Sequence, residues 1–193
     1  MTKMKSRLKK SAAVMTIVVG SVSASEGVRL VAYKDTIGTG QPWTVCFGET
    51  RGVKAGDVYT MDQCKTMLGN ALVSYETGMR RCLKTPDKVP DGPYIASLSL
   101  SYNIGVAAFC RSSVRKNLDA GNWGKACDSL LLWNRAGGRR VQGLANRRQH
   151  ERKICLDPKL QTASVSKKID EIEEGPPAQV PSKPKKRRWR FWL

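Results

Sequence analysis

The sequence predicts an α+β fold in which a small β-hairpin lobe is followed by a larger helical lobe, with a cleft expected between them. Two observations support this prediction. Glycines separate short segments containing threonine, valine and tryptophan before residue 60, whereas apolar residues recur at helical spacing after it. The chain has 193 residues, 40% of them apolar, which is enough for one core and excludes wholesale disorder.

The first 25 residues have the order of an export signal. Basic residues come first, and an uncharged segment, 11–25, follows and ends in small residues. The basic end is expected to stay in the cytoplasm while segment 11–25 enters the inner membrane. Cleavage by signal peptidase after Ala24 is one interpretation, and retention as a membrane anchor is the other. As a helix, this segment would span only ~22 Å of a hydrocarbon core of ~30 Å, so the anchor would be held weakly.

The middle of the chain, residues 26–156, is predicted to be the folded domain. Residues 26–34 are expected to continue the helix of the leader, and residues 35–56 to form the β-hairpin region with a strand at 43–47. The capping box Thr60-Met61-Asp62-Gln63 predicts a helix of about twenty residues. Prolines end this helix, and shorter helices are predicted over 94–103, 111–119, 123–133 and 143–155.

Six cysteines lie in this domain, and none lies in the leader or in the tail. An even number of cysteines behind an export signal indicates three disulfides. Six cysteines allow about 15 pairings, and we expect neighbours to pair because each bond then closes a loop of modest length. With no Cys-x-x-Cys pair and a single histidine, His150, no metal site and no cofactor are expected. The predicted bonds are Cys46–Cys64, Cys82–Cys110 and Cys127–Cys155.

The net charge is +18, and the leader, the domain and the tail are each positive. Such a chain is attracted to polyanions, among which export and disulfides argue against nucleic acid. Residues 157–193 have the composition of a disordered tail, and its end at 183–193 contains six basic and three aromatic residues. This end can bind an anionic lipid surface through charge and tryptophan, or it can remain a solvated tail.

Two carboxyl groups are the candidate catalytic residues. Glu26 is expected to open a helical stretch, and Asp35 follows nine residues later, where the glycine-rich hairpin begins. Cleavage of a glycosidic bond needs a protonated acid for the leaving oxygen and an ionised carboxylate that activates water or stabilises the transition state. Partial burial would keep Glu26 protonated, and a hydrated hairpin would keep Asp35 ionised.

Four segments accompany this pair: 26–35 (EGVRLVAYKD), 43–50 (WTVCFGET), 101–105 (SYNIG) and 133–138 (WNRAGG). Together they resemble the phage-type lysozymes, glycoside hydrolase family 24, over residues 26–156. The resemblance implies a lysozyme-like fold and a catalytic domain over this range. It also implies a muramidase that hydrolyses the β-1,4 bond between N-acetylmuramic acid and N-acetylglucosamine in peptidoglycan and lyses the host cell at the end of a phage cycle.

The resemblance also assigns roles to the candidate residues. Glu26 corresponds to the general acid, Asp35 to the carboxylate that positions water, and Thr44 to a hydroxyl that helps to hold this water. The family usually places this threonine six residues after the aspartate, whereas Thr44 lies nine residues after it. Thr39 is therefore the alternative.

Three further residues are candidate substrate-binding residues: Asn103, Arg147 and Arg148. Asn103 could bond a sugar or cap a turn. Arg147 or Arg148 could instead pair with Glu26 and change its pKa, or carry surface charge alone. Trp133 is expected in the core, and His150 on a solvated helix.

Lambdoid endolysins of this kind often carry a signal-anchor-release segment. The resemblance therefore implies a monomeric protein that is exported, tethered to the inner membrane by residues 11–25 and later released into the periplasm. While the chain is tethered, Glu26 would be held at the lipid interface, away from Asp35. Two other functions stay open: a lytic transglycosylase, for which one Glu suffices and which forms a 1,6-anhydro sugar, and a non-catalytic cationic protein that permeabilises the envelope.

Overall fold

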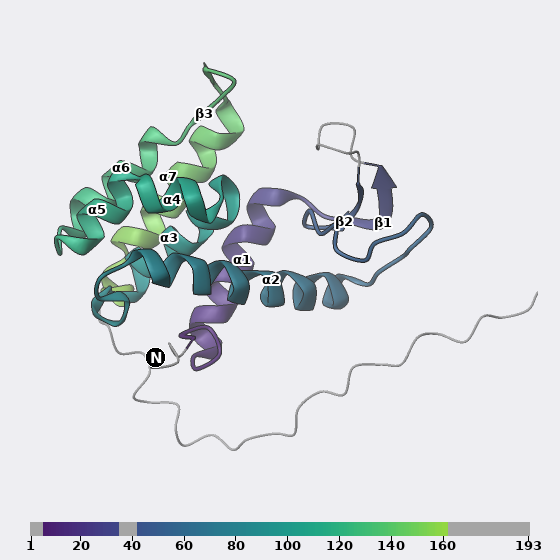
Figure 1. Cartoon of the computed structure of the whole chain (residues 1–193), viewed down its shortest axis with the longest axis horizontal. Helices are drawn as coiled ribbons and strands as arrows, with labels where there is room; N and C mark the ends of the chain where they lie inside the picture. Colours follow the sequence, from purple (N-terminus) through teal and green to yellow (C-terminus); the bar gives the residue numbers. More distant parts are fainter. Residues whose placement is uncertain (1–5, 35–41, 162–193) are drawn as a thin grey trace, which may run out of the picture.

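The computed structural model describes residues 6–34 and 42–161, and at residues 25 and 26 it describes the backbone alone. The predictions for Asp35, Thr39 and the end of the tail at 183–193 lie outside the described residues. A small lobe with two strands stands beside a helical body, and α2 extends along both (Figure 1). The helices are α1 (Ala12–Glu26), α2 (Met61–Cys82), α3 (Asp91–Ile104), α4 (Val106–Arg111), α5 (Ser113–Asp119), α6 (Trp123–Ser129) and α7 (Gln142–Leu156), and the strands are β1 (Arg29–Lys34), β2 (Trp43–Cys46), β3 (Arg135–Ala136) and β4 (Arg139–Arg140).

The small lobe is built on the antiparallel pair of β1 and β2, in which Tyr33 faces Thr44. The prediction that residues 26–34 continue a helix is wrong. Gly27 ends α1 with a φ of 68°, a conformation that glycine adopts without strain. The residues after it pair with β2, and a pairing partner that lies further along the chain leaves no signal in local helical periodicity.

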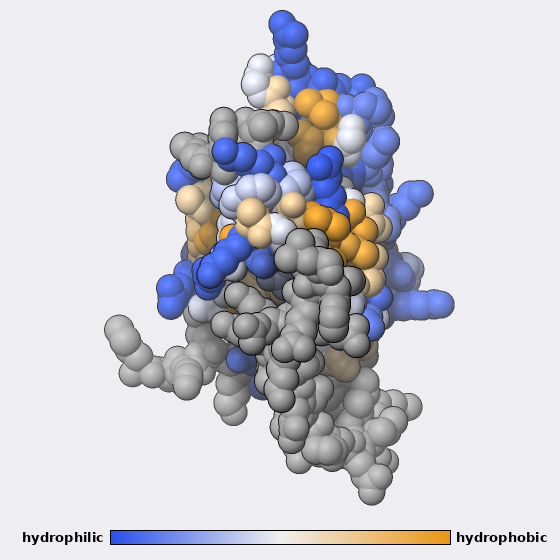
Figure 2. Space-filling view, turned by 90° about the vertical axis from the view of Figure 1, so that its right-hand side faces the viewer, coloured by the Kyte–Doolittle hydropathy of each residue, from blue (hydrophilic) through white to orange (hydrophobic). Residues whose placement is uncertain are grey.

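On the side of the molecule that carries β1 and β2, hydrophobic patches lie among hydrophilic side chains (Figure 2). Val31 and Val58 of this lobe, which form an isolated β-bridge, are 57% and 69% exposed. Scattered apolar side chains are ordinary on a protein surface. They therefore identify no binding partner.

The helix predicted after Thr60 is present as α2. The Thr60 hydroxyl oxygen accepts a hydrogen bond from the Gln63 backbone at 3.2 Å, and the Gln63 side chain accepts one from the Thr60 backbone at 2.7 Å. These two bonds complete the predicted capping box. The buried side chains recur along one face of the helix, which packs against both β2 and α3: Cys64, Leu68, Leu72, Glu76, Met79 and Arg80.

The helical body is centred on α3. All residues from Asp91 to Ser101 are buried, because α1, α2, α4 and α7 pack around this helix. A Cβ atom at Gly92 would lie 2.8 Å from the carbonyl oxygen of Ile154, so a larger residue would push α3 away from the end of α7. The shorter helices predicted for this lobe are present as α3, α5, α6 and α7. The sequence pattern does not indicate α4 or the hairpin of β3 and β4.

Helix α1 packs into this body although its sequence belongs to the predicted leader. The apolar side chains of the segment share one core with α2 and α3. The packed body therefore extends beyond the boundary predicted between residues 25 and 26, while the role of residues 1–25 as an export signal stays a prediction. No helix within 6–34 and 42–161 combines the length and apolar character needed to cross a membrane. The buried apolar side chains of the segment are Leu8, Val14, Val18 and Val22.

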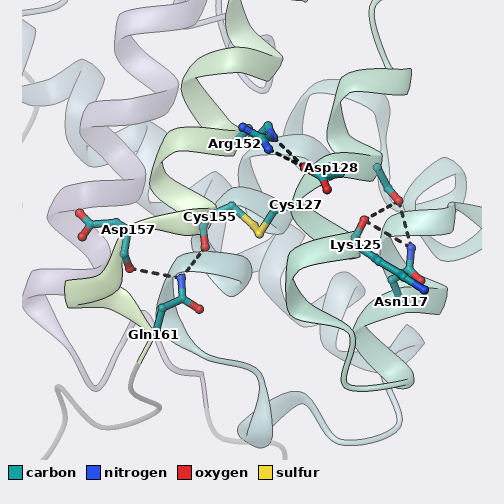
Figure 3. The surroundings of a disulfide bond; sticks show 9 residues. Asn117, Lys125, Cys127, Asp128, Arg152, Cys155, Asp157 and Gln161 are labelled. Atoms are coloured by element: carbon teal, nitrogen blue, oxygen red, sulfur yellow. Dashed lines mark hydrogen bonds and ion pairs between the residues drawn. A yellow bond between two sulfur atoms is a disulfide. The ribbon is translucent and has the colours of Figure 1, made fainter.

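The three disulfides have the predicted pairing of neighbours. They connect β2 to α2, α2 to α4 and α6 to α7. Beside the bond between α6 and α7, Arg152 pairs with Asp128, and the Gln161 amide donates to the Cys155 carbonyl at 2.7 Å (Figure 3). Disulfides restrict the unfolded chain, so these bonds stabilise both lobes and their junction.

Candidate active site

The two predicted catalytic residues flank the first strand of the hairpin. Glu26 is the last residue of α1, rather than the first residue of a helix as the sequence suggests, and Asp35 directly follows the last residue of β1. The side chain of Glu26 and the whole of Asp35 lie outside the described residues. That the two carboxyl groups lie on either side of a bound sugar therefore stays a prediction.

Thr44, the third predicted catalytic residue, lies in β2. Its side chain is buried, and its hydroxyl donates a hydrogen bond to the carbonyl oxygen of Pro42 at 3.2 Å. The hydroxyl is thus held within the hairpin lobe. Its role in binding water is a prediction, and Thr39, the alternative, is outside the described residues.

Gly48, in the loop that follows β2, lines two cavities. The smaller cavity, of about 270 Å³, is lined by Gly27, the residue after Glu26, and by residues of β1 and β2. The larger cavity, of about 490 Å³, continues between residues 48–51 and α2 and reaches Tyr102 of α3. The two cavities are called the groove below, and its lining begins with Gly27, beside the end of α1. In the part of the chain that the structure describes, no three His, Cys, Asp or Glu side chains are placed to hold a metal ion.

Glu49 is a carboxyl group of this groove that the sequence analysis missed. Burial raises the pKa of Glu49 above its ordinary value, against the opposing effects of the Arg51 charge and of a hydrogen bond with Tyr102. The Tyr102 hydroxyl also donates to the carbonyl oxygen of Phe47 at 3.1 Å, and its ring centre lies 5.0 Å from that of Tyr75. Tyr102 therefore connects the loop after β2 to α3.

The three predicted substrate-binding residues belong to one polar cluster around Glu151. Arg147 Nε lies 3.1 Å from Glu151 Oε1, and Arg148 Nε lies 3.0 Å from Glu151 Oε2. From α3, the Ser99 hydroxyl donates to Glu151 at 2.7 Å, and Asn103 Oδ1 accepts a bond from Arg148 at 3.1 Å. Both arginines and Glu151 are buried, so the idea that Arg147 and Arg148 carry surface charge alone is wrong.

Glu151 was missed by the sequence analysis, although a signal for it exists. It stands four residues after Arg147 and three after Arg148, the spacings at which side chains on a helix meet. Burial raises the pKa of Glu151, while both guanidinium groups and the Ser99 hydroxyl oppose that rise. His150 is exposed, as expected, and Trp133 packs against the core.

The Glu151 cluster lies next to the end of α1. Arg147 lines a cavity of about 280 Å³ together with His150 and Ala24, which is two residues before Glu26. Helices α1 and α7 are in contact. The structure thus brings Arg147 to the helix end that carries the predicted acid, and Arg148 is joined to Arg147 through Glu151.

A second buried ionic cluster is formed by the residues before α1. Arg7 Nη1 lies 3.0 Å from Asp91 Oδ1, and both side chains are buried. The fully buried carboxylate of Glu76 lies beside them. Both acids therefore depend on partners from the predicted leader. The donors to Glu76 are the backbone amides of Arg7 and Leu8 and the hydroxyl groups of Ser6 and Tyr94.

Comparison with known proteins identifies related sequences. The family model described as phage lysozyme matches residues 23–151. The SAR-endolysin of Enterobacteria phage P21 is 36% identical over 132 residues, which cover 68% of this chain and 77% of that protein. The SAR-endolysin of Pseudomonas phage phiKMV is 33% identical over 160 residues, which cover 81% of this chain and 96% of that protein.

Solved structures share the fold. A variant of P22 lysozyme has a TM-score of 0.65 at 30% identity, with 73% of this chain and 96% of that chain covered. The active form of the P1 phage endolysin has a TM-score of 0.63 at 25% identity, with 75% and 92% covered. These matches confirm the predicted lysozyme-like α+β fold. Because the family model matches more than half of the sequence, the chain belongs to the phage lysozyme family of glycoside hydrolases.

Proposed function

We propose that this endolysin, which degrades peptidoglycan and lyses its host cell, is a muramidase that hydrolyses the β-1,4 bond between N-acetylmuramic acid and N-acetylglucosamine. Membership of the phage lysozyme family supports this activity. The observation that carries the proposal is the groove, whose lining starts at Gly27, directly after Glu26, and extends over residues 48–51 and α2 to Tyr102 of α3. A glycan strand bound in this groove would pass the end of the helix that bears the candidate acid.

In the proposed reaction, Glu26 is the general acid and gives its proton to the glycosidic oxygen while the bond to the anomeric carbon breaks. Asp35, which stays ionised, takes a proton from a water molecule whose oxygen bonds to the anomeric carbon. Water attacks the face opposite the leaving group, so the expected outcome is inversion. Thr44 helps to hold this water.

Glu26→Gln and Asp35→Asn test these roles. Each substitution is expected to lower the rate of glycan cleavage by roughly 10²-fold or more, because it removes a proton donor or acceptor from the transition state. Mass spectrometry of the products separates hydrolysis, which leaves a reducing N-acetylmuramic acid, from the 1,6-anhydro product of a lytic transglycosylase. Undiminished cleavage by Glu26→Gln would contradict the assignment. Comparison of Thr44→Val with Thr39→Val decides which threonine contributes.

The second part of the proposal concerns the leader. Residues 11–25 first anchor the exported chain in the inner membrane and later dock as α1 of the periplasmic enzyme. The SAR-endolysins among the relatives support an anchored precursor. The burial of Val14, Val18 and Val22 supports docking as the final state. The two states exclude each other, because one helix cannot contact lipid and α3 at the same time. The anchored protein is therefore expected to be inactive. Full muramidase activity in membrane-attached protein would contradict this expectation.

The buried ionic cluster of Arg7, Asp91 and Glu76 favours retention of the leader over cleavage after Ala24. Cleavage would remove Arg7, the partner of Asp91, and the backbone donors to Glu76. A buried charge that loses its partner destabilises a protein by ~3–5 kcal/mol. The mass of the mature chain isolated from the periplasm tests this point: a chain that retains the leader supports the proposal, and a chain that begins at Ser25 contradicts it.

The basic and aromatic end of the tail, 183–193, is proposed to bind anionic lipid. Its lysines and arginines supply charge, and its tryptophans favour the membrane interface. Sedimentation with anionic or zwitterionic vesicles tests this, with a chain that ends at residue 182 as the control. Equal binding of both chains to anionic vesicles contradicts the proposal. If Glu26→Gln still lyses cells and the shortened chain does not, the non-catalytic permeabilising function replaces the muramidase.

A further inference from the structure

Glu151 is fully buried, and both of its carboxylate oxygens lie within 3.1 Å of guanidinium nitrogens on the same helix. Oε1 accepts bonds from Arg147 Nε at 3.1 Å, from Arg148 Nη2 at 3.0 Å and from the Ser99 hydroxyl at 2.7 Å. Arg147 is held from a second side, since its Nη2 donates to the backbone carbonyl of Ser99 at 3.3 Å. These bonds give each guanidinium group a fixed direction.

The charged groups described in the cluster are the guanidinium groups of Arg147 and Arg148 and the carboxylate of Glu151, and α3 adds the neutral groups of Ser99 and Asn103. Arg147 also lines the cavity that reaches Ala24 of α1. The guanidinium group of Arg147 therefore lies close to the helix end at which α1 is followed by Gly27.

We propose that Glu151 is a positioning residue that holds Arg147 and Arg148 at the end of α1 and offsets part of their charge there. This inference rests on the proposed function of Glu26 as the general acid. Glu151 acts through the two arginines and does not contact the substrate. Two arginines that lacked this carboxylate would stabilise the ionised form of Glu26 more strongly, and the acid would then hold its proton over a narrower range of pH.

Other charged or titratable groups also face this end of α1. His150 shares the cavity with Ala24, Arg29 and Tyr33 of β1 share one with Gly27, and Lys65 of α2 lines a cavity with Ser23. The replacement of Glu151 alters none of these residues. The parent and the Glu151 variant can therefore be compared against the same surrounding groups.

The test is the pH dependence of kcat/KM for cleavage of purified peptidoglycan by the full chain. Activity falls on the alkaline side when the general acid loses its proton. Glu151→Gln keeps the shape of the side chain and removes its charge, so it should move this alkaline limb to lower pH by roughly half a unit to one unit. A purely structural role would lower activity at every pH by the same factor and leave the limb in place.

Two further variants complete the experiment. Asp128→Asn is the matched control, because it removes the exposed carboxylate that pairs with Arg152, which also lies on α7. Its limb should coincide with that of the parent. Asn103→Asp adds a carboxylate beside Arg148, at a half-buried position, and should move the limb to higher pH. In combination with Glu151→Gln, Asn103→Asp should return the alkaline limb towards its position in the parent protein.

The outcomes separate the two proposals. A limb that stays in place in Glu151→Gln, or that moves equally in Asp128→Asn, overturns the positioning role. If Glu151→Gln does not fold, as judged by thermal unfolding, Asn103→Asp alone decides, and an unmoved limb there also overturns it. Retained cleavage by Glu26→Gln instead removes the proposed function, whatever the position of the limb.

Discussion

Helices α1 and α2 lie against each other but form for different physical reasons. The signals for α2 lie within its own sequence: a capping box at Thr60 and Gln63, an acidic first turn and a basic last turn. Helix α1 has a cap at Ser11, but no acidic residue in its first turn and no basic residue in its last. Its contacts with the core and the anchoring of Arg7 therefore hold it in place.

This difference bears on the proposal that one segment occupies first a membrane and then the protein core. The uncharged segment 11–25, with its small and β-branched residues, requires mainly an apolar environment, which both a bilayer and a protein core provide. The core differs from a bilayer because it contains two buried acids, Glu76 and Asp91, that bind Arg7 before α1. The four predictions that follow test these two helices and then the groove, in order of decreasing expected effect.

The largest effect is expected from Arg7→Gln, which leaves Asp91 buried without its cation. We expect the free energy of unfolding, measured with urea, to fall by ~3 kcal/mol. Lys9→Gln removes the same charge from an exposed position and should leave stability nearly unchanged. The double variant Arg7→Gln/Asp91→Asn should recover part of the loss. Equal stabilities of Arg7→Gln and Lys9→Gln would show that α1 is not held by this cluster.

Val18→Ala tests the packing of α1. Val18 is fully buried, so the substitution removes apolar contacts and leaves a cavity, with an expected loss of ~2 kcal/mol in the same urea measurement. Thr16→Ala, at an exposed position of the same helix, is the control. An identical small effect of both substitutions would mean that α1 does not pack in the core of the folded enzyme.

Thr60→Ala tests the local signal of α2. The substitution removes the hydroxyl oxygen that accepts from the Gln63 backbone, and the expected loss of stability is ~1 kcal/mol. Thr66→Ala, at an exposed position within α2, provides the comparison and should change stability less. If Thr60→Ala lowers the free energy of unfolding more than Val18→Ala does, it is wrong that local signals stabilise α2 while tertiary contacts stabilise α1.

The smallest effect is expected from Glu49→Gln, in the groove. Because burial raises the pKa of Glu49, the folded state binds this proton more tightly than the unfolded state does. The resulting stability is complete below the ordinary pKa and is lost as the pH rises through the raised pKa.

At neutral pH, Glu49→Gln should therefore raise the unfolding temperature slightly. The gain in the free energy of unfolding should be below ~1 kcal/mol, because solvent screens the charge of a half-exposed group. The gain should vanish in acid. Calorimetry at both pH values checks this, with Glu49→Asp as a control that retains the charge. A gain of the same size at both pH values would contradict the assigned pKa shift.

Much of the fold and part of the site follow from the sequence alone. The helix after Thr60, the strand that contains Thr44 and the three disulfides could be predicted, because caps, glycine-rich turns and cysteines act over short distances along the chain. The motif from Glu26 to Asp35 also indicated the family. These features depend on the identity and spacing of neighbouring residues.

The tertiary structure decided the rest. It made residues 29–34 a strand by supplying β2 as a partner, and it placed α1 in the core by supplying α3 and the carboxylates that bind Arg7. It also turned Glu151 into the centre of a buried cluster. Burial and pairing depend on groups that are distant in sequence. Because the hydrophobic effect is non-directional, a local pattern of apolar residues shows that a face will be buried but not which element will cover it.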